Sequence, residues 1–239
     1  WTLLRCARND GWAERPRSPS EPPGPAFLYT DAMTLQQAIA KHQAGDLDGA
    51  ERLYREILAE QPAQPDELHL LGLIHYARGD AATAAELIRT AIDHASDTAV
   101  YHFNLGNVCR ALGDAAAALD AYRAAIARAP DEADYHNNLG TLFEALEDWS
   151  AARDCFHRAV ALQPDDVELH VNLANAQRAL GATDQAAAGY RHALALAPEM
   201  AVLHQTLADL YSDLERPADA LPHYRRAQEL DPGNAVLHV

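Results

Sequence analysis

The chain has 239 residues, of which 49% are hydrophobic and 7% aromatic, so it can bury a sizeable core but has few rings to fill it. Its formal net charge of -16 at pH 7 argues against nucleic acid and anionic membranes as partners, because both need a basic surface. Three scattered cysteines without a CxxC pair, and no apolar run long enough to span a bilayer, indicate a soluble cytoplasmic protein.

The first segment, residues 1–32, is rich in proline and polar residues, as in RPRSPSEPPGPAF, and cannot pack a core. We expect a disordered leader that is irrelevant to function, with Met33 standing just before the first repeat helix. A proline-rich ligand segment for another protein is the alternative.

From there to the end, residues recur at intervals of 34. Histidine, proline and alanine each occupy one column of the repeat. The expected array, residues 33–239, consists of blocks 31–64, 65–98, 99–132, 133–166, 167–200 and 201–234, and of a partial block, 235–239. The histidine column contains His102, His136, His170, His204 and His238.

Each block has the pattern of two helices. In block 133–166 a first helix is expected over about residues 134–146 and a second up to about residue 162, each with one apolar face. Gly45, Gly79, Gly113 and Gly181 follow the first helices, where a left-handed residue ends a helix. Block 133–166 has Glu147 and Asp148 there instead. Pro164 ends the second helix, and Asp165 is expected to cap the next one.

This pattern resembles the tetratricopeptide repeat over roughly residues 31–239: a small residue after Leu in the first helix, then Ala, an aromatic residue, Ala and Pro. Departures are local, such as Ser96 in place of the proline. The resemblance implies an all-α, right-handed superhelical solenoid of antiparallel helix pairs, whose first helices line an inner groove. Small residues such as Gly106 and Gly140 are expected to let the helices approach closely, with rings such as Tyr122 and Phe156 beside them.

The histidine column is expected to pack between helices rather than to bind metal. Equivalent positions on successive first helices lie about two helix layers apart, each roughly 8–10 Å thick, so neighbouring imidazoles cannot easily share one ion. We find no phosphate loop, zinc spacing or nucleophile motif, and therefore expect a non-catalytic protein without cofactor or metal.

The polar residues of the first helices are the candidates for binding. At 100° per residue, the second, sixth, ninth and thirteenth positions of a block lie opposite the core positions, which predicts an exposed groove face. An amide there offers donors and an acceptor to an extended peptide backbone. Arginines at the twelfth position could meet acidic ligand groups, although solvated arginines at a helix end are the alternative. The candidate groove residues are Asn104, Asn107, Asn138, Asn172, Asn175, Arg110 and Arg178.

The His-x-Asn-Leu blocks are most similar to the repeats that precede the catalytic domain of O-linked N-acetylglucosamine transferases and their bacterial relatives. That resemblance implies that Asn104, Asn138 and Asn172 hold polypeptide, whereas Leu70 and Thr206 interrupt the column. A carboxylate clamp for chaperone tails is excluded, because the second and fifth positions carry no cation.

We therefore expect a protein–protein interaction scaffold for an extended peptide or a partner helix. The alternative is the substrate-recruiting arm of a glycosyl-, sulfo- or methyltransferase whose catalytic domain lies beyond Val239. An uncapped last repeat would also allow self-association. A single lysine, Lys41, beside abundant alanine and arginine favours a bacterial gene.

Overall fold

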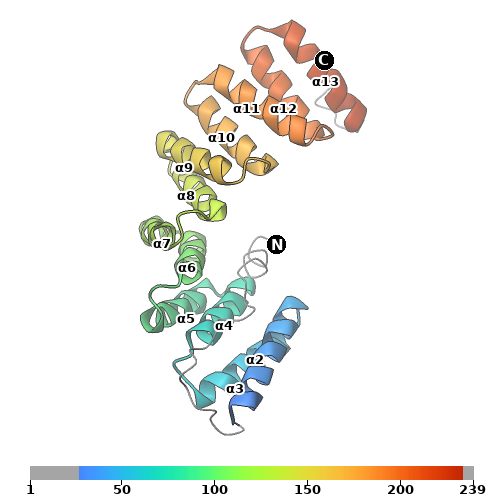
Figure 1. Ribbon diagram of the computed structural model, residues 1–239. Coiled ribbons are helices and arrows are strands. Elements are labelled where there is room, and N and C mark those ends of the chain that lie inside the picture. Colours follow the sequence, from blue (N-terminus) through green and yellow to red (C-terminus); the bar gives the residue numbers. More distant parts are fainter. Residues whose placement is uncertain (1–26, 234–239) are drawn as a thin grey trace. The chain divides into compact units, whose positions relative to one another are not determined.

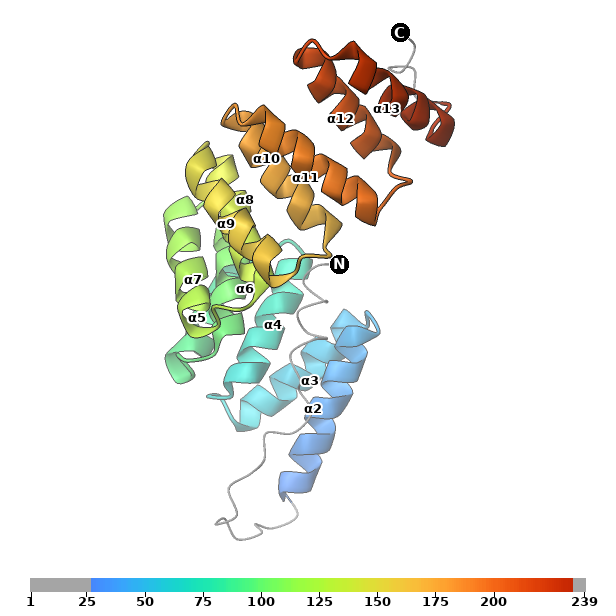
Figure 2. The same ribbon diagram turned by 45° about the horizontal axis from the view of Figure 1, so that its top comes forward.

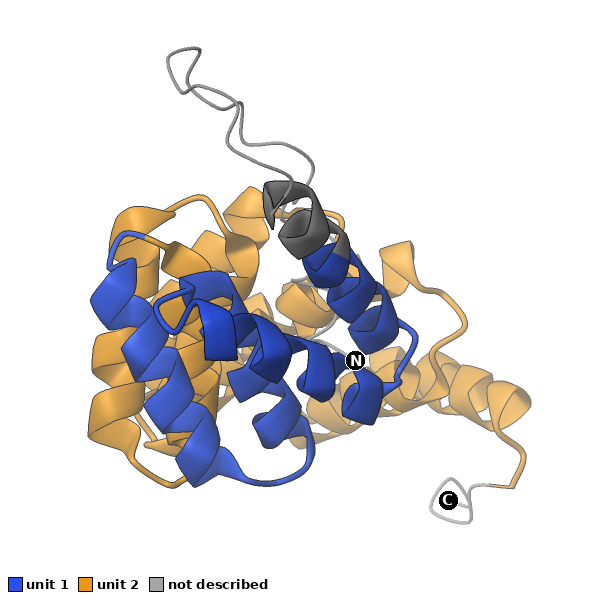
Figure 3. Cartoon of the chain, turned by 90° about the horizontal axis from the view of Figure 1, so that it is seen from below, with its two compact units in different colours: residues 1–97 blue, residues 98–239 orange. Residues whose placement is uncertain are grey.

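The computed structural model describes residues 27–233, with side chains from Thr34 onward. Within this range the chain forms twelve α-helices and no strand, so the expected all-α solenoid of antiparallel helix pairs is confirmed (Figure 1). The chain divides into two compact units, residues 1–97 and 98–239 (Figure 3). Most of the expected leader and the partial repeat 235–239 lie outside the described residues.

Unit 1 contains the helix pairs of the first two blocks, and each of its helices packs on the next. Its helices are α2 (Phe27–Gln43), α3 (Leu47–Glu60), α4 (Pro65–Ala77) and α5 (Ala81–His94). Helix α2 begins at Phe27, six residues before Met33, so its first turns lie within the segment expected as a leader.

Unit 2 contains the pairs of the next four blocks, and its helices stack in chain order (Figure 2). Its helices are α6 (Ala99–Ala111), α7 (Ala115–Arg128), α8 (Ala133–Ala145), α9 (Trp149–Leu162), α10 (Val167–Ala179), α11 (Thr183–Leu196), α12 (Ala201–Asp213) and α13 (Pro217–Leu230). No helix among the described residues is long and apolar enough to cross a membrane.

The turn inside each repeat is built as its residues predict. Gly113 ends α6 with φ of 75°, and Glu147 takes the same left-handed conformation with φ of 59° after α8. The aspartate that follows caps the second helix: Asp114 accepts a hydrogen bond from the Ala117 amide at 3.0 Å. Between repeats, Asp166 and not Asp165 caps α10, so that expectation was wrong by one residue.

Close contact inside each repeat explains the small-residue column. A Cβ atom built on Gly106 would lie 2.6 Å from the Tyr122 ring, and one on Gly140 would lie 2.7 Å from the Phe156 ring. Both rings are fully buried. In the next repeat the first helix carries Ala174 and the glycine lies on the second helix, where a Cβ atom on Gly189 would lie 3.0 Å from the Ala174 Cβ atom. In the first and last helix pairs the equivalent residues are alanines, Ala38 and Ala208, both fully buried.

Candidate functional site

The structure places the candidate residues on three first helices of unit 2. Asn104, Asn107 and Arg110 lie on α6, Asn138 lies on α8, and the others lie on α10. The structure brings the amides of neighbouring first helices together, but it does not leave all of them exposed.

Asn107 is a buried junction between three helices. Its Oδ1 accepts a hydrogen bond from the Tyr122 hydroxyl of α7 at 2.7 Å and another from the Asn138 amide of α8 at 2.8 Å. The side chain exposes only 5% of its surface. An amide oxygen has two lone pairs, so these two bonds use its full acceptor capacity. Asn107 therefore holds helices together.

A second amide bond connects α8 to α10. The Asn172 Nδ2 group donates to Asn137 Oδ1 at 3.0 Å. Asn137 is one residue from Asn138 and was not among the sequence candidates. Together, the two bonds form an amide ladder, Asn107–Asn138 and Asn137–Asn172, which runs across three consecutive first helices of unit 2. Asn138 and Asn172 remain partly exposed.

The ninth position of a repeat is coupled to the aromatic residue of its second helix. The Tyr190 hydroxyl donates to Asn175 Oδ1 at 2.6 Å, and the Tyr224 hydroxyl donates to Asp209 Oδ1 at 2.7 Å. Where the ring is Phe156, which has no hydroxyl, the ninth residue is Thr141. Burial raises the pKa of Tyr190, so its hydroxyl keeps its proton and remains a donor.

The expected exposure of the whole groove face is therefore wrong in part. Asn104 exposes only 2% of its surface and Asn107 5%, whereas Asn138, Asn172 and Asn175 are half-buried. A helical wheel identifies the side of a helix that faces away from its own core, but neighbouring first helices also bury part of that side. One sequence pattern indicates this burial: every block with Asn or Asp at the ninth position has a tyrosine at the twenty-fourth position.

The two arginines lie at the exposed ends of the first helices. Arg178 donates to Asp213 of α12 at 3.0 Å, and the two side chains are 41% and 64% exposed. Such an exposed pair contributes at most about 1 kcal/mol to stability. Arg110 is exposed at the end of α6. Both guanidinium groups are accessible to an acidic group of a ligand.

The histidine column joins consecutive repeats. His136 donates from Nε2 to the Pro130 carbonyl at 2.8 Å, and His170 donates to the Pro164 carbonyl at 2.7 Å. His204 repeats the contact with Pro198 at 3.1 Å. Each proline follows the end of the preceding second helix. Each imidazole is therefore hydrogen-bonded to the loop that leads into its own first helix. Among the described residues, no group of three or more His, Cys, Asp or Glu residues could hold a metal ion.

Unit 1 has different chemistry at the equivalent positions. The sixth-position residue is the exposed Gln36 in its first repeat and Leu70 in its second, where the preceding His69 exposes only 2% of its surface. Burial lowers the pKa of His69 to about 3, so the ring is neutral near pH 7. The amide ladder described above is a feature of unit 2.

Comparison with known proteins identifies the repeat. A family model described as the tetratricopeptide repeat matches residues 35–99, 69–133 and 137–201, and a second model with that description matches residues 201–234. No curated protein sequence matches the chain significantly.

Several solved structures share the fold. The Pseudomonas aeruginosa pilF structure has a TM-score of 0.74 at 17% identity, covering 88% of this chain and 96% of that one. YrrB, described as a TPR protein with an unusual peptide-binding site, has a TM-score of 0.67 at 19% identity, covering 77% and 95%. MamA has a TM-score of 0.64 at 23% identity, covering 72% and 94%. At these identities the likeness shows the fold alone.

Proposed function

Because the chain belongs to the tetratricopeptide repeat family, we propose that it is a non-catalytic protein–protein interaction scaffold. Its first helices in unit 2 would bind an extended peptide or a partner helix from another protein. The surface offers amides and guanidinium groups, which recognise polar and acidic groups without bond-making chemistry. The net charge of -16 supports a protein partner over nucleic acid, and Cys109 and Cys155, neither of which is in a disulfide, support a cytoplasmic location.

One observation carries this proposal: the amide ladder fixes how Asn138 and Asn172 are oriented. Each Nδ2 group donates one of its two protons to the preceding first helix. Among the described interactions, the Oδ1 atom and the second proton of each amide have no partner. An amide whose orientation is already fixed loses less conformational entropy when a ligand binds. The pair therefore presents one acceptor and one donor per repeat, which is what an extended backbone requires.

The other candidates take supporting roles in the proposal. Asn107 and Asn175 position the ladder and the second-helix tyrosines, since their oxygens are already bonded within the protein. Arg110 and Arg178 lie near the end of the same helices and would meet acidic groups of the bound segment. Asn104, which is buried, would contact a ligand only after a local rearrangement.

A second proposal is that these repeats recruit the substrate of a larger transferase. The three His-x-Asn-Leu blocks, which resemble those of O-linked N-acetylglucosamine transferases, favour it. An open reading frame that continues beyond Val239 into an α/β pattern would support this reading, whereas a short capping helix and a stop codon would support the independent scaffold. Self-association through the C-terminal repeat is a further expectation of the scaffold, tested by sedimentation at several concentrations.

The test uses two matched double variants. Asn138→Ala with Asn172→Ala removes the oriented amides, and Gln185→Ala with Gln228→Ala removes two exposed amides from the second helices α11 and α13. Peptide-array binding should fall for the first variant only. Each lost neutral hydrogen bond is worth about 0.5–1.5 kcal/mol, so we expect about five- to 150-fold weaker binding for two.

Folding must be measured in parallel, because Asn138 and Asn172 also bond within the protein. A small drop in melting temperature with a large loss of binding supports the proposal. Equal binding by the wild type and the Asn138→Ala, Asn172→Ala variant, at full helical content, would contradict it and direct attention to the second helices.

A further inference from the structure

Two histidines join the helices of the last described repeat. The Nδ1 atom of His204 on α12 lies 3.0 Å from the Nδ1 atom of His223 on α13, and the ring centroids are 5.3 Å apart. His204 belongs to the 34-residue histidine column, and His223 does not. A nitrogen–nitrogen distance of this size is a hydrogen bond, in which one Nδ1 carries a proton and the other offers a lone pair.

The surrounding contacts fix which nitrogen carries the proton. The Nε2 atom of His204 lies 3.1 Å from the Pro198 carbonyl, which can only accept, so Nε2 must be protonated. In neutral His204 the Nδ1 atom is therefore the acceptor. His223 must then donate from Nδ1, which leaves its own Nε2 without a proton. The pair thus has one defined arrangement of protons at neutral pH.

Helix α13 buries fewer of its own side chains than the second helix of the preceding repeat. Its fully buried residues are Ala220 and Ala227, whereas α11 buries five residues that include Tyr190 and Leu194. Pro222 lies inside α13 and has no amide proton, so one helical hydrogen bond is missing in the turn before His223. The side-chain hydrogen bonds that link α13 to α12 include the histidine pair and Tyr224–Asp209.

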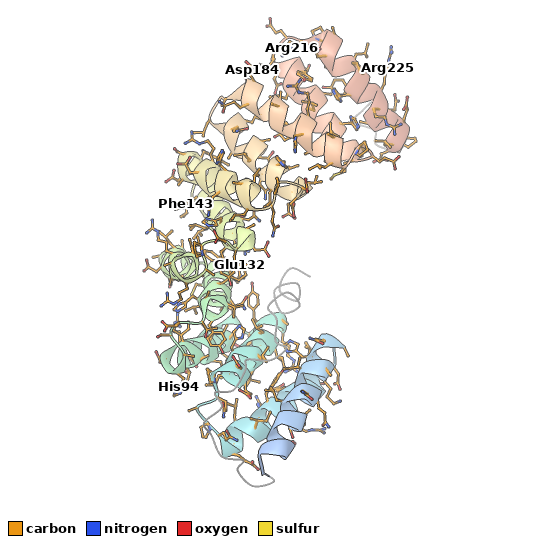
Figure 4. The ribbon with its side chains drawn as sticks, viewed as in Figure 1. His94, Glu132, Phe143, Asp184, Arg216 and Arg225 are labelled. Atoms are coloured by element: carbon orange, nitrogen blue, oxygen red, sulfur yellow. The ribbon has the colours of Figure 1, made fainter. Side chains whose placement is uncertain are left out.

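Few other charges act on the pair. Asp219, one turn earlier on α13, favours a proton on His223, whereas burial and the neighbouring His204 disfavour it. Tyr211 of α12 has its ring 6.0 Å from the His223 ring, and the Arg216 guanidinium lies over Tyr211. Arg216 also donates to the Asp219 carboxylate at 2.8 Å. The carboxylate of Asp184 on α11 lies 4.0 Å from the Arg216 guanidinium (Figure 4). Asp219 is therefore already engaged with a cation.

We propose that His204 and His223 form an acid-sensitive latch that holds α13 against α12. An added proton enters at the His223 Nε2 atom, because the other three ring nitrogens of the pair already take part in hydrogen bonds. The charge then lies on a half-buried ring next to a second imidazole, and water solvates it better when α13 separates from α12.

The direction of the pH dependence follows from the environment of the pair. Burial, together with His204, lowers the pKa of His223 below its ordinary value. The unfolded chain then binds more protons than the folded chain below about pH 6.5. The latch contributes fully above that pH and is weakened as the pH falls toward 5. The carboxylates of Asp209 and Asp219 ordinarily titrate near pH 4, outside this window.

Nitrogen-15 NMR of the histidine rings in the intact protein tests the arrangement of protons directly. At pH 7.5 we expect the Nε2–H tautomer at His204 and the less common Nδ1–H tautomer at His223. His223 should titrate below pH 6.5. Finding Nε2–H on both rings, with His223 titrating at or above pH 6.5, would overturn the proposal without any mutation.

Hydrogen exchange tests the mechanical consequence. Protection factors of α13 amides, corrected for intrinsic rates and measured in EDTA, should fall by about 3–10-fold between pH 7.5 and pH 5.0, in line with losing one hydrogen bond. His223→Gln keeps a donor but cannot charge, so this variant should show little change between the two values. The control variant is His192→Gln. It removes an exposed ring whose centroid lies 4.2 Å from that of His170, both in the repeat before the latch, and its α13 amides should show the same pH response as the wild type. An equal pH response of the wild type and His223→Gln would overturn the latch.

Discussion

Replacing Gly140 by leucine should strongly destabilise unit 2, because the space beside this residue is already filled by a buried ring. A Cβ atom at Gly140 would lie 2.7 Å and 2.8 Å from two carbons of Phe156, which is fully buried and cannot move into solvent. Overpacking typically costs about 1–3 kcal/mol, and leucine adds three carbons beyond Cβ. Removing a helical glycine offsets at most about 1 kcal/mol. We therefore expect a net loss of roughly 2 kcal/mol or more.

The assay is thermal and urea unfolding followed by circular dichroism. A loss of about 2 kcal/mol corresponds to a melting temperature lower by about 4–8 °C for a domain of this size. Ala145→Leu is the matched control, since it adds a larger side chain at an exposed position of the same helix. If Gly140→Leu and Ala145→Leu melt together within error, then the close contact between α8 and α9, and the repeat register on which it rests, are wrong.

A suppressor variant separates the clash from other effects. Gly140→Ala with Phe156→Leu replaces the ring that the added Cβ would meet. The double variant should lose less stability than the sum of the two single changes, with an interaction energy of about 0.5–3 kcal/mol. Simple additivity would show that the ring is not what limits the size of residue 140.

Three further changes test other parts of the account. Asn107→Leu should lower the free energy of unfolding by about 1–3 kcal/mol, because the Tyr122 hydroxyl and the Asn138 amide both lose their acceptor; a urea midpoint equal to wild type would contradict the buried junction. Acid should destabilise unit 1 in two stages. Burial lowers the pKa of His69, so stability is full above about pH 6.5 and falls below it; Arg78 lowers the pKa of Glu51, so that contribution is lost only as the pH falls below about 4. A melting temperature higher at pH 5 than at pH 7.5 would contradict the predicted loss of stability in acid. Zinc calorimetry at neutral pH should show no tight, saturable site that depends on His136 and His170, because their Nε2 groups donate to proline carbonyls; a site lost in His136→Gln and His170→Gln would refute their structural role.

The fold could be predicted from the sequence because the same residue pattern recurs in successive repeats. One 34-residue period, with a small residue, a ring, an alanine and a proline at fixed places, determines two helices and their contact. Local signals such as Gly113, with its positive φ, were sufficient to locate the turns. The periodic pattern begins after residues 27–32 and so says nothing of the first turns of α2, and Asp166 was confused with its neighbour because both are good caps.

The site was harder to predict, because it depends on contacts between repeats. The wheel correctly separated the polar stripe from the core, but it could not reveal that Asn107 bonds with two neighbouring helices. Asn137 was missed because it lies one position away from the stripe that the wheel defined. His223 lies outside every repeated column, and only the packing of α13 on α12 brings it to His204.

The central claim is that the side-chain amides of Asn138 and Asn172 contact the bound polypeptide. The most direct measurement is the nitrogen-15 NMR spectrum of side-chain amides, recorded while a peptide selected from the array is titrated to saturation. The account predicts that the Asn138 and Asn172 resonances shift and broaden together, whereas those of Gln185 and Gln228 on the second helices stay unchanged. Saturable binding that shifts only Gln185 or Gln228 would contradict the account.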